Sequence, residues 1–144
     1  MSLKDIAVKL DSGPVPGSSE TTGLAVALLR EVADHLNTVS QGGDRQVVEL
    51  TNLPLSDGDL QLLEEKLGRG EVEARINAAG PTEVFETAYP GVWWVKYLGE
   101  DDRVITQQLE IGTVPMILEA HREDIQASAR QFPSTFDELD PKQQ

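Results

Sequence analysis

The sequence predicts an α+β fold in which an antiparallel four-stranded meander sheet carries helices packed mainly on one face. In the first half of the chain, apolar residues recur at the spacing of an amphipathic helix. At about residue 72 this spacing changes to strict alternation, which is typical of a half-buried strand. The apolar segments that follow are joined by short connections, and short connections favour antiparallel neighbours.

The domain organisation follows from changes in composition. Residues 1–20 are expected to form an N-terminal segment and a flexible linker, because residues 11–23 (DSGPVPGSSETTG) are rich in Gly, Pro, Ser and Thr. A single α+β domain is expected over residues 21–132. Residues 133–144 are expected to form an acidic, polar tail.

Two helices are predicted ahead of the sheet. The first spans about 21–39, because an apolar stripe repeats there at helical spacing. The stripe consists of Ala25, Leu28, Leu29, Val32, Leu36 and Val39. The second helix begins after Ser56, its expected N-cap, and ends at Gly68. Between the two helices, residues 47–50 (VVEL) form either a short strand or an extended lead-in.

The strands of the meander are expected at about 72–78, 83–89, 92–98 and 103–111. A last helix is expected over about 121–131, where apolar residues again share one side.

Composition and charge exclude several classes of function. The net charge of −13 repels nucleic-acid backbones and anionic membranes. Solubility is the main interpretation of this charge, and an acidic face for a basic partner is the second. The chain has no cysteine, which excludes disulfides and thiolate chemistry and fits a cytoplasmic protein. No apolar run approaches the roughly 20 residues that a membrane span needs.

The segment 91–98 (GVWWVKYL) concentrates aromatic residues in a chain that has few. Successive side chains of a strand point to opposite faces, so Trp93 and Trp94 are predicted to lie on opposite sides of the sheet. Trp93 and Tyr97 share one of these sides. Helices are expected to cover one face of the sheet. The other face is also apolar and needs to be covered by the tail, a second subunit or a partner. The alternative is that both tryptophans are core residues of a sheet covered on both sides.

Glu86 is a second candidate for contact with a partner. Its expected strand places it on the same face as Val84 and Ala88. An acid on an apolar face must be paired, exposed at an edge or functional. We expect Glu86 to face a partner.

The cluster EAHRED at 119–124 surrounds His121 and suggests another class of function. Carboxylates beside an imidazole are compatible with a metal-binding or hydrolytic protein. No second His lies within ligand spacing, however, and acids also suit the start of a helix. Motifs of phosphate-binding loops and nucleophile elbows do not occur. The sequence therefore predicts no catalytic, cofactor-binding or metal-binding residue.

Three fragments of the sequence are distinctive in combination. They are LGRGEV at 67–72, GPTEVFET at 80–87 and GVWWV at 91–95, and they are followed by VPMIL at 114–118. Together they resemble the conserved C-terminal domain of the HupH hydrogenase expression/formation proteins. The similarity covers about residues 47–130.

This resemblance implies a cytoplasmic, chaperone-like or scaffold-like accessory role in [NiFe] hydrogenase maturation, without enzymatic activity. The expected partner is an immature hydrogenase subunit or another maturation factor. Because the chain has no cysteine to hold an iron fragment, we expect protein binding without a cofactor. The expected partner-binding residues are Glu86, Trp93, Trp94 and Tyr97, with Gly70 and Glu71 of the first motif. A plain homodimeric interaction domain is the remaining alternative.

Overall fold

A computed structural model describes residues 19–78, 80–139 and 141 of the chain. The described chain falls into two compact units, of which the first ends at Val114 and the second begins at Pro115. Most of the expected N-terminal segment and linker, residues 1–18, lies outside the described residues.

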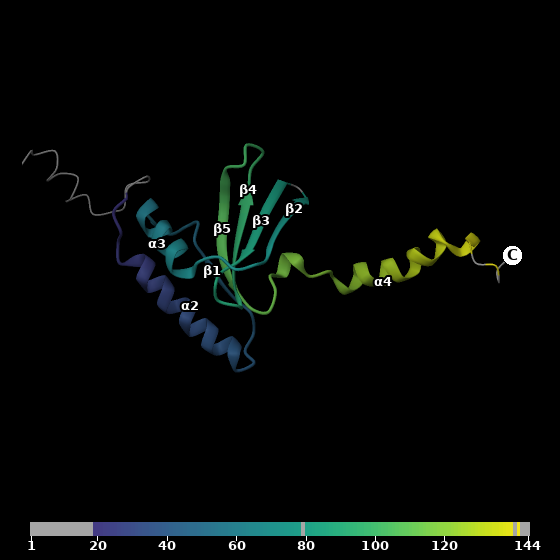
Figure 1. Ribbon diagram of the computed structural model, residues 1–144, viewed down its shortest axis with the longest axis horizontal. Coiled ribbons are helices and arrows are strands. Elements are labelled where there is room, and N and C mark those ends of the chain that lie inside the picture. The colour runs from purple at the N-terminus through teal and green to yellow at the C-terminus, as the bar shows by residue number, and fades with distance from the viewer. Residues whose placement is uncertain (1–18, 79, 140, 142–144) are drawn as a thin grey trace, which may run out of the picture. The chain divides into compact units, whose positions relative to one another are not determined.

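The described residues of the first unit form two helices and one antiparallel sheet (Figure 1). Its elements are α2 (Leu24–Ser40), β1 (Gln46–Glu49), α3 (Asp57–Leu67), β2 (Glu73–Ala78), β3 (Gly80–Glu86), β4 (Val92–Leu98) and β5 (Val104–Ile111). The strands lie in the order β1-β5-β4-β3-β2, and each neighbouring pair is antiparallel. The strands β2 to β5 are therefore the predicted meander.

The described residues form a sheet of five strands, so the prediction of four strands is wrong in number. The additional strand is β1, which comes from the 47–50 segment and pairs with β5. Its residue Val48 lies opposite Leu109, and both side chains are buried. In the sequence, α3 and the three strands β2 to β4 lie between β1 and β5. The pairing of β1 with β5 is therefore not predicted by short connections, which favour neighbours in the chain.

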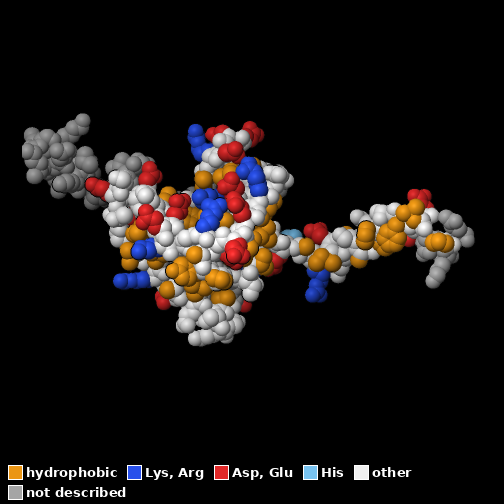
Figure 2. Space-filling model, in the orientation of Figure 1, with side chains coloured by type: hydrophobic (Ala, Val, Ile, Leu, Met, Phe, Trp, Pro, Cys, Tyr) orange, Lys and Arg blue, Asp and Glu red, His pale blue; other side chains and the backbone are white. Residues whose placement is uncertain are grey.

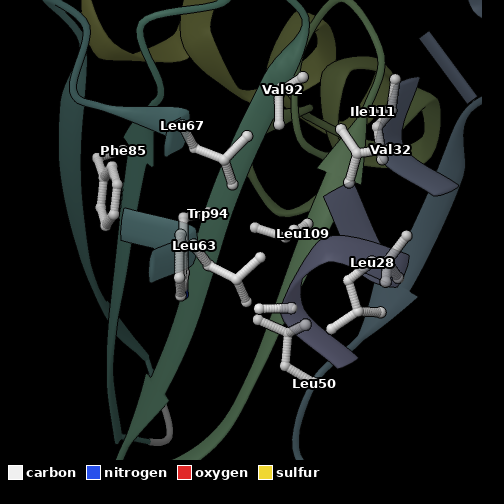
Figure 3. Close-up of a cluster of buried hydrophobic side chains, with 12 residues drawn as sticks. Leu28, Val32, Leu50, Leu63, Leu67, Phe85, Val92, Trp94, Leu109 and Ile111 are labelled. Atoms are coloured by element: carbon white, nitrogen blue, oxygen red, sulfur yellow. The ribbon is translucent and has the colours of Figure 1, made fainter. Parts of the chain in front are cut away.

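One hydrophobic core lies between the two helices and one face of the sheet, as the fold class predicts (Figure 3). The Trp94 and Phe85 rings stack at the sheet surface, with centroids 5.8 Å apart and planes 19° apart. Leu63 and Leu67 of α3 belong to the same buried cluster as Trp94. The buried members are Ala25, Leu28, Val32, Val48, Leu50, Leu63, Leu67, Phe85, Val92, Trp94, Leu109 and Ile111. The sheet face beneath the helices is therefore sealed by apolar side chains.

Local signals define α3 as predicted. The Ser56 hydroxyl accepts a hydrogen bond from the Asp59 backbone N–H, and the Asp59 carboxylate accepts one from the Ser56 N–H at 3.1 Å. The same carboxylate accepts hydrogen bonds from the Thr22 N–H and hydroxyl, at 2.7 and 2.8 Å. Asp59 thus caps α3 and ties the chain ahead of α2 to it. The helix ends at Gly68, whose φ of 66° favours glycine.

The second unit contains α4 (Arg122–Gln131), which confirms the last predicted helix, and short 3₁₀ turns. These turns span Met116–Leu118, Phe132–Thr135 and Asp137–Leu139. Several large apolar side chains of this unit are exposed, as Figure 2 shows along its length. Within the described residues, every helix is too short or too polar to cross a lipid bilayer.

Candidate functional site

The strand β4 has the alternation that the sequence predicts. Trp94 points into the core beneath the helices, and Trp93 points to the opposite side of the sheet. The same parity puts Val95 and Tyr97 on the side of Trp93. The prediction of a strand that carries aromatic side chains on both faces is therefore confirmed.

We call the side of the sheet that α2 and α3 do not cover the second face. The pairing register assigns to it Val72, Ala74, Ile76, Thr82, Val84, Glu86, Trp93, Val95, Tyr97, Thr106, Gln108, Glu110, Val47 and Glu49. Its composition is uneven: apolar residues predominate on β2 to β4, and polar or acidic residues predominate on β5 and β1. The boundary between these halves passes through the β4–β5 pair.

At this boundary Trp93 lies between two carboxylic acids. The register places Glu86 of β3 directly opposite Trp93 on one side and Glu110 of β5 on the other. The indole N–H donates a hydrogen bond to the Gly112 carbonyl oxygen at 3.2 Å, so the ring is fixed in orientation. Trp93 and Glu110 are only 6% and 5% exposed, and Glu86 is half-buried.

The acidic character of this region also affects Tyr97. Burial raises the pKa of the Tyr97 phenol, and the negative charges of Glu110 and Glu49 raise the pKa further. The phenol therefore stays protonated and can donate a hydrogen bond at neutral pH. A half-buried tyrosine close to carboxylates is suited to hydrogen-bonding or basic groups of a partner.

Gly70 fixes the position of Glu86 from the edge of the sheet. Its N–H donates to the Glu86 carbonyl oxygen at 2.8 Å. A Cβ atom at Gly70 would lie 2.5 Å from the Thr87 carbonyl oxygen and 2.7 Å from Glu86 Oε1. Any larger residue would therefore clash at this position. Glu71, the next residue, is exposed. The fold thus brings the LGRGEV and GPTEVFET motifs into direct contact.

The structure separates the six residues that the sequence singles out. Trp93, Tyr97 and Glu86 lie on the second face, and Gly70 and Glu71 lie ahead of β2, next to the end of β3. Trp94 is 1% exposed and belongs to the helix-covered core, where its indole N–H donates to Gln107 Oε1 at 3.0 Å.

Glu110 is not among the partner-binding residues that the sequence predicts. Its alternation with Leu109 and Ile111 indicates a side chain on the polar side of its strand, but only the register brings it opposite Trp93.

His121 lies in the second unit, where it is exposed and precedes the first residue of α4. Over the part of the chain that the structure describes, no three His, Cys, Asp or Glu side chains come together in a group that could hold a metal ion.

Together these features define a class: a small α+β domain whose distinctive residues lie on a sheet surface and at its edge. Comparison with known proteins is more specific. The chain belongs to the HupH hydrogenase expression protein family, because the model of that family's C-terminal conserved region matches residues 24–139. The resemblance seen in the sequence motifs is thereby confirmed.

Curated relatives match this chain over part of their length. It is 35% identical over 115 residues to hydrogenase expression/formation protein HupH of Rhodobacter capsulatus, an alignment that covers 80% of this chain and 42% of the relative. It is 36% identical over 105 residues to hydrogenase expression/formation protein HoxQ of Azotobacter vinelandii, covering 73% and 36%. The chain thus spans about two fifths of the length of the curated relatives it matches.

A solved structure has the same fold. Hydrogenase expression protein HupH from Thiobacillus denitrificans ATCC 25259 aligns with a TM-score of 0.76 and 35% sequence identity. The alignment covers 83% of this chain and 99% of that chain.

Proposed function

We propose that this chain is a non-enzymatic accessory protein of [NiFe] hydrogenase maturation, which holds an immature hydrogenase subunit in the cytoplasm. The observation that carries the proposal is membership of the HupH family, together with relatives named for hydrogenase expression and formation. Its action is chaperone-like: it covers a surface of the unfinished subunit and releases it when assembly proceeds.

The contact surface in this proposal is the second face next to Trp93. Glu71 is exposed, and Glu86 and Tyr97 are half-buried, so these three side chains supply the accessible polar groups. Trp93 presents little surface of its own and supports Glu86 from the neighbouring strand. Tyr and Trp are enriched at the centres of protein interfaces, and flanking carboxylates favour a partner with basic or hydrogen-bonding groups.

The test is capture of separately expressed immature large and small hydrogenase subunits by the full chain. The chain offers a matched pair of variants on β3, Glu86→Lys on the second face and Glu83→Lys on the opposite face. We expect the unchanged chain and Glu83→Lys to retain one subunit, and Glu86→Lys to lose at least about tenfold in apparent affinity.

If neither subunit is retained by the unchanged chain, the proposed function is wrong. If both variants retain the subunit equally, the role is compatible with the data but the contact surface is wrong. Sedimentation of the chain alone at low concentration decides the homodimer alternative, because a stable dimer would show that a second copy occupies an interaction surface.

A further inference from the structure

A separate groove runs along the outer edge of β1. It has a volume of about 310 Å³ and lies between α2, β1 and the segment after β1. The lining residues are Leu24, Ala27, Leu28, Glu31, Val47, Val48, Glu49 and Leu53. Val47 and Val48 point to opposite faces of the sheet, so a groove that both of them line must lie at the edge of the strand.

The backbone of β1 is available for pairing at this edge. β1 is a terminal strand of the described sheet and has β5 on one side only. The Leu50 N–H donates to the Gln107 carbonyl oxygen at 3.0 Å, so alternation turns the N–H and C=O groups of Val47 and Glu49 away from β5. An open edge of this kind is a template for an added strand.

The residues that line the groove indicate what kind of segment it can bind. Its floor and walls are mostly aliphatic, and both of its charged lining residues, Glu31 and Glu49, are exposed acids. Glu31 Oε1 lies 3.4 Å from His35 Nε2, and Glu49 Oε1 accepts from the Thr51 N–H at 3.1 Å. Neither contact involves a Lys or Arg side chain. The groove volume is at the small end of ligand pockets, which suits a side chain better than a large free ligand.

We propose that this groove binds an extended, basic segment of a partner protein, which adds to β1 as a sixth strand. An apolar side chain of the segment enters the groove between α2 and Leu53. A Lys or Arg two residues away points to the same side and meets Glu31, and an adjacent Lys or Arg points to the second face and meets Glu49.

The site shares Val47 and Glu49 with the second face. It contains none of the accessible contact residues Glu71, Glu86 and Tyr97, and it goes beyond the proposed function. A second copy of this chain is a poorer occupant than a basic segment. The chain has a net charge of −13, so pairing two copies at this edge would place like charges close together.

The probe is a fluorescein-labelled, C-terminally amidated Lys-Lys-Val-Lys-Lys peptide, in which the central Val has Lys side chains both on its own side of the strand and on the opposite side. Fluorescence anisotropy with the full chain should give saturable binding, and ¹H–¹⁵N NMR should show the largest amide shifts at Val47 and Glu49 and along the first two turns of α2. The double variant Glu31→Lys/Glu49→Lys should weaken binding at least about tenfold. Glu65→Lys, at an exposed position of α3, is the matched control. It should change the affinity for the peptide by less than about twofold.

Two further peptides separate strand addition from simple charge attraction. A peptide with N-methyl groups on alternate amides keeps the charge but cannot pair with an edge strand, and should lose binding. A Glu/Val peptide should bind the double Lys variant better than it binds the unchanged chain. The proposal is overturned if the Lys/Val peptide does not bind, if the N-methylated peptide binds equally well, or if Glu65→Lys weakens binding as much as the double variant.

Discussion

Trp93 and Trp94 are neighbours in the chain and are both buried, but their surroundings differ in kind. Trp94 packs among aliphatic side chains and stacks on Phe85 beneath α3. Trp93 lies in a row of side chains that places a carboxylic acid on either side of it. Burial of apolar side chains contributes to stability, whereas the carboxylic acids of this largely buried row cost desolvation. The helix-covered face is thus stabilised by apolar packing around Trp94, whereas the second face combines buried residues such as Val84 and Val95 with carboxylic acids that are suited to recognition.

The largest effect is expected from a substitution in the core beneath the helices. Trp94→Ala removes a fully buried ring and its stacking on Phe85, and should lower the free energy of unfolding by about 3–5 kcal/mol. Urea unfolding followed by circular dichroism measures this loss. A loss below about 1 kcal/mol would mean that the core does not depend on this ring.

Gly70→Ala should have the next largest effect. The new methyl group would press on the Thr87 carbonyl oxygen, and moving that backbone should cost about 1–3 kcal/mol. Because the same glycine supports Glu86, this variant should also weaken subunit capture beyond what its lower stability explains. Unchanged urea unfolding would contradict the close approach of the two motifs.

Asp59→Asn tests how the chain ahead of α2 is held. Burial alone would raise the pKa of Asp59, but hydrogen bonds from Thr22 and Ser56 outweigh it and lower the pKa overall. A lowered folded-state pKa gives stability that is present above the unfolded pKa and is lost as the pH falls through the folded value. Loss of this cap should cost about 1–2 kcal/mol at neutral pH.

The pH dependence of this variant is the control. The difference in unfolding free energy between the unchanged chain and Asp59→Asn should shrink as the acid carboxyl becomes protonated. A difference that stays constant from neutral pH down to the range below the unfolded pKa would rule out the ionised carboxylate as its source.

The smallest effect concerns the electrostatics of the second face. Glu49→Gln removes one of the negative charges that raise the pKa of Tyr97, so the phenol should titrate at a lower pH. Ultraviolet absorbance of the tyrosinate, measured against pH, reports the change, and Tyr89→Phe simplifies the signal. An upward shift, or none, would show that Glu49 does not act on Tyr97.

Features that depend on neighbours in the sequence could be predicted. Ser56 and Gly68 bound α3 as expected, because capping uses backbone groups within one helical turn. The opposite directions of Trp93 and Trp94 follow from strand geometry alone.

Features that depend on distant partners could not be predicted. Asp59 holds Thr22 from 37 residues away, and nothing in either segment indicates the other. The proximity of Glu110 to Trp93 requires the β4–β5 register, and β1 pairs with β5, from which α3 and the strands β2 to β4 separate it in the sequence. These are consequences of tertiary pairing, which local periodicity does not encode.

Photocrosslinking at two adjacent positions of β4 tests the central contrast most directly. Tyr97 lies on the second face and Lys96 on the helix-covered face, and both are half-buried. With p-benzoylphenylalanine at position 97, the chain should crosslink to an immature hydrogenase subunit, and with the same group at position 96 it should not. Crosslinking from position 96 alone, or from neither position while the subunit is still captured, would contradict a recognition role for the second face.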